Sequence, residues 1–227
     1  MKGIDAEIGR RKQMVHVYVA DITGLPDPLG TSQVMEGLSE ERRQKIVRYK
    51  QSEGRRQSLG AGLLLRQALA RHGTQETGVY IGENGKPEVK GICFNLSHSH
   101  NMVVCAISKK TVGCDLEKEE SSEKEKIAER FFHGTETAYL KNRKDEFFRL
   151  WTMKESYVKM TGEGLRLPLD QFEIRFEERA KIYRDGRACA CFIKEYEIPG
   201  YRLTVCAEES EFVSQVEYIP LANNGGS

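Results

Sequence analysis

Two short apolar runs of nearly the same sequence constrain this chain more than any other feature. MVVCA occupies residues 102–106 and LTVCA occupies residues 203–207, and each run closes a series in which a helical segment is followed by strand-like segments. Such a repeat predicts two similar α+β halves that meet near residues 108–111. A similarity this short also arises by chance, so two unrelated parts are an open alternative at this point.

Size and charge exclude several classes of protein. The 227 residues suffice for one large domain or two small ones, and 39% apolar with 30% charged residues is typical of a globular chain. The net charge of +1 lacks the basic excess of a dedicated nucleic-acid binder. Apolar runs such as MVVCAI are far shorter than the roughly 20 residues that span a bilayer. The polar start MKGIDAEIGRRKQ lacks the apolar core of a signal peptide, so we expect a cytoplasmic protein without nucleic-acid or membrane partners.

The periodicity of apolar residues predicts helices and strands in an order that fits two halves. Valines at every second position predict a strand over 14–22, and residues 38–51 read as a helix with Ser39 as its N-cap. A second helix over 55–73 ends at Gly73. Further strands are expected within 92–108, 112–117, 171–178, 180–185, 190–198 and 201–209, and further helices around 122–131 and from 147 to Gly162. We predict an α+β fold with halves over 14–110 and 111–219 and a disordered tail over 220–227.

The cysteines are expected to be reduced and to act as small hydrophobes. No C-x-x-C spacing occurs, and most of the six lie inside strand-like apolar runs such as GICFNL and LTVCAE. A disulfide framework or a zinc site is therefore disfavoured.

Asp115 and Glu117 in VGCDLE are the first candidates for chemistry. If residues 112–117 form a strand, the two carboxylates point to the same face and repel each other. A positive group should lie opposite them, and a hard cation with oxygen ligands is a natural candidate. Alternatively, the pair is the solvated end of a strand that runs into the acidic residues 119 and 120.

The segment FFRLWTMKESYVKMTGEGL, residues 147–165, predicts a helix with an apolar and a charged face. Leu150, Trp151 and Val158 are expected to form the packed back of this helix, while Glu155 and Lys159 share another face at i, i+4. Taken alone, such a pair is most often a surface salt bridge worth a few tenths of a kcal/mol.

Glu155 gains a second interpretation from the acidic pair. Together with Asp115 and Glu117 it would complete a cluster of carboxylates of the kind that suits Mg²⁺, which fills its octahedron with water and phosphate oxygens. A lysine such as Lys159 beside that cluster could neutralise a pyrophosphate as its bridging bond breaks.

The motif FNLSHS is predicted to place a polar turn, Ser97-His98-Ser99, between two short strands. His98 is either a turn histidine that caps local backbone or a donor to a phosphate oxygen. His98 and His100 alone do not form a zinc site, because no second ligand pair follows at a suitable spacing.

In this order, GKP, FNLSHS, VGCDLEK, RFF and LWTMKESYVKMTGEGL resemble the 4′-phosphopantetheinyl transferases of the surfactin-synthetase-activating (Sfp-like) type. The similarity runs from about Met14 to Ala207, and W-x-M-K-E-S-x-x-K is its most specific part. The resemblance implies a pseudo-dimer of two similar α+β halves, each a small antiparallel sheet packed with helices, with the active site at the seam. It also implies an activity: transfer of the 4′-phosphopantetheine arm of coenzyme A to a serine of an apo carrier protein, with release of 3′,5′-ADP.

The resemblance further implies roles for individual residues. Asp115, Glu117 and Glu155 match the family's Mg²⁺ ligands, Glu155 also matches the carboxylate that helps to deprotonate the serine, and Lys159 matches the lysine near the diphosphate. Lys154 belongs to the motif without an evident role. The positions that match segments in contact with coenzyme A, a co-substrate here, are Gly85, Lys86, Pro87, Ser97, His98 and Lys159.

The sequence departs from the family at two places. Cys114 stands where Val or Ile is usual, which is a conservative change. Glu41 and Gln44 stand where close relatives have lysines that hold the 3′-phosphate. The chain is rich in lysine and arginine between residues 42 and 56. The residues that we expect to contact coenzyme A there, in or beside this basic segment, are Arg42, Arg43, Gln44, Lys45, Arg56 and Gln57. Alternatively, this segment is a solvated helix face.

Two rival functions are open to the sequence. One is a catalytically inactive module that binds coenzyme A or a carrier protein, against which the intact acidic trio and Lys159 count. The other is a different metal-dependent phosphotransferase, and the absence of a G-x-x-x-x-G-K-[ST] loop counts against a P-loop version. The expected partners are carrier proteins or carrier domains of peptide, polyketide or fatty-acid synthases. We expect a monomer, because two joined halves already contain an interface.

Overall fold

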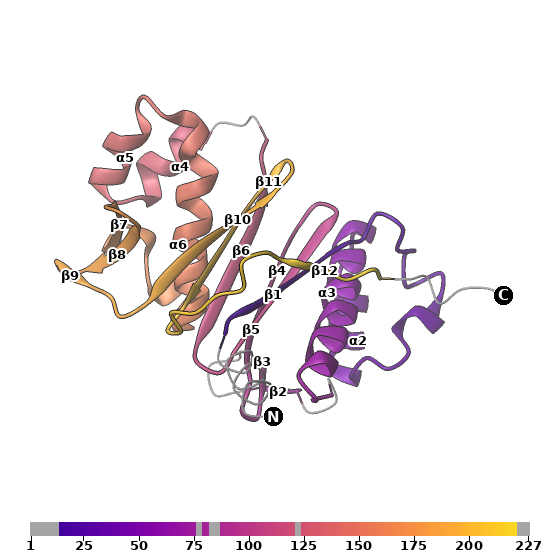
Figure 1. Ribbon diagram of the computed structural model, residues 1–227. Coiled ribbons are helices and arrows are strands. Elements are labelled where there is room, and N and C mark those ends of the chain that lie inside the picture. The colour runs from indigo at the N-terminus through magenta and orange to yellow at the C-terminus, as the bar shows by residue number, and fades with distance from the viewer. Residues whose placement is uncertain (1–13, 76–78, 82–86, 121–123, 222–227) are drawn as a thin grey trace, which may run out of the picture.

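A computed structural model of the chain describes residues 14–75, 79–81, 87–120 and 124–221 (Figure 1). The first part contains β1 (His16–Asp21), α2 (Glu40–Arg48), α3 (Ser52–Arg71), β2 (Val79–Ile81), β3 (Pro87–Val89), β4 (Cys93–Ser99) and β5 (Met102–Ser108). The second part contains β6 (Val112–Lys118), α4 (Lys124–Phe131), α5 (Gly134–Leu140), α6 (Phe147–Thr161), β7 (Phe172–Phe176), β8 (Ala180–Arg184), β9 (Arg187–Ala188), β10 (Phe192–Ile198), β11 (Tyr201–Ala207) and β12 (Glu217–Tyr218). The predicted α+β class is confirmed. Among the described residues, no helix has the length and apolar character needed to cross a membrane.

Two sheets with the same strand order form the centre of the molecule. The first has the order β12-β1-β5-β4 and the second the order β10-β11-β6. The runs MVVCA and LTVCA lie in β5 and β11, and each of these strands is flanked on both sides by antiparallel neighbours. In each part the first strand is followed by helices and then by a hairpin whose second strand pairs with the first. Two small sheets, β2-β3 and β7-β8-β9, lie outside this pair.

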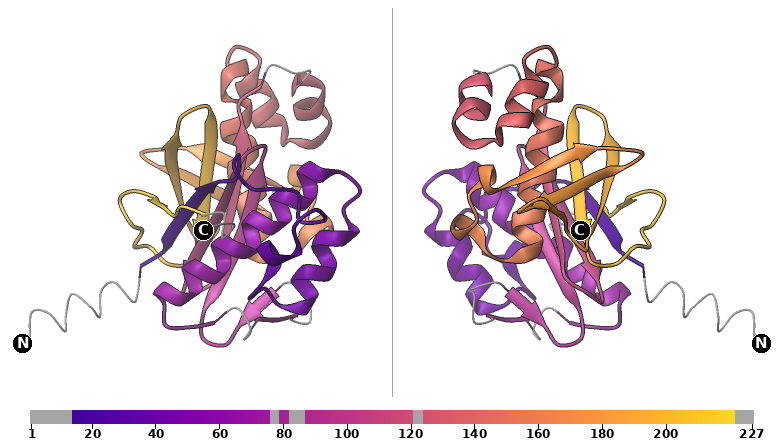
Figure 2. Two further views of the ribbon diagram at one scale, coloured as in Figure 1. Left: turned by 90° about the vertical axis from the view of Figure 1, so that its right-hand side faces the viewer. Right: turned by 90° about the vertical axis from the view of Figure 1, so that its left-hand side faces the viewer.

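Side-chain alternation along the strands builds the layers. In β5, Val104 and Ala106 pack against residues of the second sheet, such as Leu116 and Val205, whereas Val103 faces a core that α3 covers. Both faces of these strands are buried, which explains their nearly continuous apolar sequence. Full burial of each valine or leucine contributes roughly 1.5–3 kcal/mol relative to exposure. The order is thus α3, first sheet, second sheet and α6, and Figures 1 and 2 show the two helices on opposite sides of the strands.

Three predicted helix boundaries agree with the structure, whereas α2 ends at Arg48 before the predicted residue 51 and α3 begins at Ser52 before the predicted residue 55. The Ser39 hydroxyl accepts a hydrogen bond from the Arg42 N–H at 3.3 Å, so it caps α2 as expected. Helix α3 ends at Arg71 and Gly73 follows with φ of 71°. Helix α6 ends at Gly162, whose φ is 72° and whose N–H bonds the Val158 carbonyl. Only glycine adopts this left-handed conformation at low cost.

The prediction of a turn at Ser97-His98-Ser99 is wrong. These residues belong to β4, and Ser99 pairs with Met102 of β5. The turn is formed by the next two residues, and His100 takes the positive φ of 51° that it requires. Polar residues are accommodated inside this strand because their side chains meet hydrogen-bonding partners on β6, as described below.

The segment Phe212–Leu221, here called the C-terminal strap, returns to the first sheet. β12 pairs with β1 in parallel, and the Ile219 N–H bonds the Val19 carbonyl at 2.8 Å. Ile219 is buried in the core beneath α3 and Leu221 packs against that core. Residues 212–219, which the predicted division assigns to the second half, therefore contact the first. Most of the predicted tail, residues 222–227, lies outside the described residues.

The cysteines agree with their predicted state. All six are free thiols, and Cys105, Cys114 and Cys206 are buried, while the other three are half-buried.

Candidate active site

The two faces of β6 contact different parts of the molecule. Alternate residues from Val112 to Leu116 pack between the sheets, which leaves Gly113, Asp115 and Glu117 on the face toward α6. Asp115 is only 3% exposed. The alternative that this pair is a solvated strand end is therefore wrong for Asp115.

Gly113 allows α6 to lie directly on this face of β6. A Cβ added to Gly113 would stand 2.1 Å from the Ser156 carbonyl oxygen and 2.3 Å from the Met160 nitrogen, both of which are backbone atoms of α6. A strand and a helix that approach this closely bring their polar side chains into one space.

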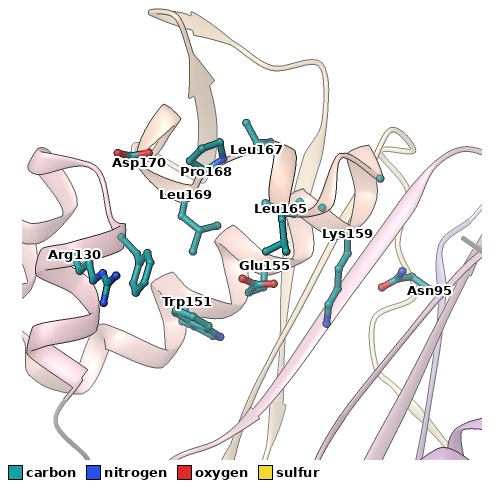
Figure 3. A pocket seen from close by; sticks show the side chains of 14 residues that line it. Asn95, Arg130, Trp151, Glu155, Lys159, Leu165, Leu167, Pro168, Leu169 and Asp170 are labelled. Carbon is teal, nitrogen blue, oxygen red and sulfur yellow. The ribbon is translucent and has the colours of Figure 1, made fainter. Parts of the chain in front are cut away.

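Trp151, Glu155 and Lys159 follow one another along one side of α6, at i, i+4 and i+8 (Figure 3). Trp151 packs against the core as predicted, and it also lines the same cavity as Glu155. Its ring also packs against those of Phe132 and Phe147, with centroids 6.1 and 5.8 Å away. Trp151 therefore packs against this aromatic core and also forms part of the cavity wall.

A cavity of about 290 Å³ brings the predicted catalytic and metal-binding residues together. The side chains that line it come from β4, β6 and α6: Leu96, Ser97, His98, Asp115, Glu117, Trp151, Glu155 and Lys159. All four residues predicted to carry the chemistry, two from β6 and two from α6, are in this set. We call it the acidic cavity.

Lys159 supplies the positive charge predicted opposite the acidic pair. Its Nζ lies 2.6 Å from Asp115 Oδ1 and 3.0 Å from the Ser97 hydroxyl. Burial lowers the pKa of Lys159, but the Asp115 carboxylate more than offsets this and the pKa is raised overall. Lys159 is therefore a permanent cation in the cavity at neutral pH.

The two glutamates of the cavity hold protons more strongly than exposed glutamates do. Burial raises the pKa of Glu155, the negative charge of Asp115 raises it further, and Lys159 partly compensates. The pKa of Glu117 is raised by the same two causes, with the Ser99 hydroxyl acting in the opposite direction. A carboxylate with a raised pKa is a better proton acceptor near neutral pH.

A second cavity, of about 170 Å³, adjoins the acidic cavity through His98. Arg42 and Lys45 of α2 line it together with Tyr49. Burial lowers the pKa of His98, and the charges of Lys159 and Lys45 lower it further, so the imidazole is neutral at neutral pH. We call this second space the basic cavity.

The other residues predicted on the coenzyme A side are more scattered. Gln44 donates to Glu40 Oε1 at 3.1 Å on an exposed part of α2, and Gln57 of α3 donates to the His100 carbonyl. Arg56 is half-buried on α3. Pro87 begins β3. Two further predicted positions lie outside the described residues: Gly85 and Lys86.

A third, apolar cavity of about 700 Å³ opens on the other side of Glu155 (Figure 3). Phe131 of α4 lines it together with Leu165 and Leu169, which lie in two short 3-10 helices after α6, and Leu165 is fully exposed. Glu155 and Lys159 belong to both this cavity and the acidic cavity. The two α6 side chains therefore stand between a polar and an apolar space.

Lys154, for which the sequence indicates no role, links α6 to α5 and β7. It is completely buried, and its Nζ bonds Glu136 of α5 at 2.6 Å and the Phe172 carbonyl at 2.8 Å. Glu136 also accepts a hydrogen bond from the Ile174 N–H at 2.7 Å. Burial lowers the pKa of Lys154 and the neighbouring Glu136 carboxylate opposes that effect. This pair ties the residue next to Glu155 to α5 and β7.

The donor atoms of the acidic cavity fit a hard cation. Asp115 Oδ2 is buried and has no hydrogen-bond partner among the described residues. In that part of the chain, no three His, Cys, Asp or Glu side chains converge into a ready-made ligand set. Mg²⁺ does not require one, because it usually binds one or two carboxylates and completes its shell with water and phosphate oxygens.

Sequence reasoning missed three residues that shape this site. Asn95 and Ser99 of β4 bond to β6, and Gly113 sets the distance between β6 and α6. The alternation of polar residues in N-L-S-H-S and the glycine two positions before Asp115 are the signals that could have revealed them.

Asp115, which is buried, and Glu117, which is half-buried, face a lysine beside a basic cavity, an arrangement typical of the class of proteins that transfer phosphate-bearing groups. Comparison with known proteins agrees with this class: the model of the 4′-phosphopantetheinyl transferase superfamily matches residues 111–206. A 4′-phosphopantetheinyl transferase of Bacillus subtilis is 36% identical over 199 residues, which cover 81% of this chain and 88% of the relative.

Two further relatives have similar sequence identities to this chain. The 4′-phosphopantetheinyl transferase Sfp of Bacillus subtilis strain 168 is 35% identical over 203 residues, or 82% of this chain and 88% of the relative. The 4′-phosphopantetheinyl transferase gsp of Aneurinibacillus migulanus is 36% identical over 181 residues, or 75% of this chain and 76% of the relative. The chain belongs to the 4′-phosphopantetheinyl transferase superfamily, and its resemblance to the Sfp type is confirmed.

Proposed function

We propose that this protein transfers the 4′-phosphopantetheine arm of coenzyme A to a serine of an apo carrier protein and releases 3′,5′-ADP. The observation that carries the proposal is the acidic cavity, in which Asp115, Glu117 and Glu155 share one space with the cationic Lys159. The names of the relatives support the same reaction.

Asp115, Glu117 and Glu155 are the residues that would hold Mg²⁺. The ion, when bound, neutralises negative charge on the diphosphate of coenzyme A. The buried Asp115 Oδ2, which has no partner among the described residues, supports this assignment, as does the position of Glu117 two residues further along the same strand face.

The side chains of α6 account for the movement of the serine proton and for binding of the diphosphate. In the reaction, the serine oxygen forms a bond to the phosphorus that bears the pantetheine arm, and the bond from that phosphorus to 3′,5′-ADP breaks. Glu155 accepts the serine proton, a role that its position between the acidic cavity and the apolar cavity favours. Lys159 attracts the diphosphate and stabilises the charge on the departing 3′,5′-ADP.

The two flanking cavities suggest where the substrates lie. The basic cavity suits the phosphate-bearing nucleotide end of coenzyme A, because two of the residues expected there, Arg42 and Lys45, line it, whereas Gln44 does not. His98 borders both cavities and could donate to a phosphate oxygen between them. The apolar cavity suits the carrier protein, because it opens directly beside Glu155. Contacts through Gly85, Lys86, Pro87, Arg56 and Gln57 stay predictions.

The shared strand order supports a pseudo-dimer of two related halves. β1-β5-β4 and β6-β11-β10 follow the same path, and the acidic cavity draws its side chains from β4 of one sheet and β6 of the other. We therefore place the active site at the seam between the halves. The monomeric state, the cytoplasmic location and the type of carrier stay predictions.

Intact mass spectrometry of an apo carrier protein incubated with the enzyme, coenzyme A and Mg²⁺ tests the proposal. We expect the carrier to gain one phosphopantetheine arm, and no gain on peptidyl, acyl and aryl carriers would refute the proposed function. Glu155→Gln should abolish transfer without changing the unfolding temperature. Glu129→Gln, an exposed glutamate on α4, is the matched control and should retain full transfer.

The same experiment tests the alternative of an inactive binding module. Such a module would bind coenzyme A or the carrier in a direct binding assay while the carrier mass stays unchanged. Near-normal turnover by Glu155→Gln would instead leave the reaction in place and refute the role of this residue.

A further inference from the structure

The seam between β4 and β6 is held by side chains of β4. Every second backbone N–H of β6 donates to a polar side chain of β4, so the two strands are joined without a shared backbone ladder. The three bonds run from Cys114 to Asn95 Oδ1 at 3.0 Å, from Leu116 to Ser97 Oγ at 3.3 Å and from Lys118 to Ser99 Oγ at 3.1 Å. From one bond to the next the residue number rises by two on β4 and on β6, so the two strands run parallel at this seam.

Each of the two serine hydroxyls at this seam donates its proton to one carboxylate oxygen. A serine hydroxyl donates one hydrogen bond and accepts two. Ser97 accepts from a β6 N–H and from Lys159, so its proton points to Asp115 Oδ1, 3.0 Å away. Ser99 accepts from the next N–H and donates to Glu117 Oε2 at 3.0 Å. Each serine thus binds one oxygen of one carboxylate.

We propose that Ser99 is a positioning residue that orients the Glu117 carboxylate for the cation. The inference rests on the proposed function, because that function supplies the cation. A glutamate side chain on a strand has several rotamers of similar energy, and a hydroxyl fixed by the backbone of β6 selects one of them. Hydrogen bonds of this kind orient metal ligands, and their loss typically lowers metal affinity about 10–100-fold.

Ser99 is a better subject for a test than Ser97. Ser97 also contacts Lys159, and it lines the acidic cavity itself, so its replacement would disturb several parts of the site. The Ser99 hydroxyl bonds only to Glu117 and to the Lys118 N–H among the hydrogen bonds found in the described residues. The effect of Ser99→Ala is therefore confined to one carboxylate and one N–H of β6.

Ser108 offers a matched control at the end of β5. It is buried, as Ser99 is, and its hydroxyl accepts a backbone N–H, that of Lys110 at 3.2 Å. Its bond partner is not an acidic residue, and it lies outside the set that lines the acidic cavity. Ser108→Ala therefore removes a comparable backbone contact and leaves the carboxylates untouched.

Calorimetric titration of Mg²⁺ into the full-length protein with coenzyme A, without a carrier, measures the effect directly. We expect Ser99→Ala to weaken Mg²⁺ binding about 10-fold or more, and Ser99→Thr, which keeps the hydroxyl, to restore it to within about threefold. In transfer assays, the Mg²⁺ concentration for half-maximal rate should rise for Ser99→Ala, while KM for coenzyme A at saturating Mg²⁺ changes little. Ser108→Ala should match the wild type in both measurements.

The outcomes separate this inference from the proposed function. Equal Mg²⁺ binding by the wild type and Ser99→Ala would overturn the role of Ser99 and leave the function intact. An equal loss in Ser108→Ala, or in Ser99→Thr, would overturn it as well, because the loss would then follow from a general change in the fold. A wild type that binds no Mg²⁺ would overturn the proposed metal site and this inference with it.

Discussion

Gly113→Ala should inactivate the enzyme by separating α6 from β6. The added Cβ would lie 2.1 Å from the Ser156 carbonyl oxygen, whereas ordinary contacts begin at 3.4 Å, so strand and helix must move apart by about 1.3 Å. All three clashing atoms on α6 belong to its backbone, so no rotation of a side chain relieves the contact. The perturbation acts on the helix as a whole.

The size of the effect follows from the geometry of the acidic cavity. Lys159 on α6 contacts Asp115 on β6 at 2.6 Å, and a separation of about 1.3 Å would lengthen this contact beyond hydrogen-bonding distance. A misplacement of about 1 Å in a catalytic site typically costs about 100-fold in rate. Overpacking of a buried contact costs about 1–3 kcal/mol of stability. We therefore expect a folded enzyme whose kcat/KM is lower by about two orders of magnitude.

Steady-state transfer kinetics and urea unfolding measure the two consequences separately. Gly134→Ala is the matched control, because a Cβ at Gly134 would meet nothing within 4 Å. That variant should keep wild-type kinetics and stability. If Gly113→Ala retained turnover within threefold of the wild type and lost no stability, the close approach of α6 and β6 would not be what positions Lys159 and Glu155.

Three further predictions concern the helix anchor, the basic cavity and pH. Lys154→Met should destabilise the fold by about 3–5 kcal/mol in urea unfolding, because it leaves the Glu136 carboxylate buried without its partner. Replacement of Arg42 and Lys45 by glutamine should raise KM for coenzyme A about 10-fold or more in transfer assays, because charge-assisted contacts to phosphate are lost. Burial lowers the pKa of His72 to about 4, below its usual 6.5. The neutral ring is therefore favoured in the folded state, and its contribution of about 1–3 kcal/mol is complete above pH 6.5 and lost as the pH falls toward 4. His72→Gln should flatten this part of the stability profile.

Each of these predictions has a result that would contradict it. Lys141→Met removes an exposed lysine and should leave stability unchanged, so an equal loss in both variants would deny a special role to Lys154. Gln44→Ala should not alter KM for coenzyme A. A larger effect from Gln44 than from Arg42 and Lys45 would show that the nucleotide end lies elsewhere. An unchanged pH profile in the His72 variant would assign the acid sensitivity to other groups.

Strong local rules determine which residues come together within each element of the acidic cavity. Residues at i and i+2 of a strand share a face, and residues at i and i+4 of a helix share a side, which places Asp115 with Glu117 and Glu155 with Lys159. The contact between these two pairs depends on tertiary packing. The preference of Mg²⁺ for several carboxylates suggests this contact and the resemblance to a family supports it, but no local pattern states that β6 packs against α6.

The differences between the expectations and the structure also have physical causes. S-H-S predicts a turn because serine is common in turns, but here Ser97 and Ser99 satisfy N–H groups of β6. Trp151 packs against the core as predicted, and because it lies four residues before Glu155 it also shares the side of the helix that lines the cavity. The role of Lys154 could not be inferred, because its partner Glu136 lies on another helix.

The C-terminal strap implies an order of events during synthesis. β1 leaves the ribosome well before β12, which covers its edge. An unpaired strand edge readily pairs with other chains. Since domains begin to fold while translation continues, the first sheet is exposed to aggregation until β12 has been made. A premature stop before residue 212 would leave that edge open permanently, so we expect shortened chains to aggregate even when every residue of the acidic cavity is present.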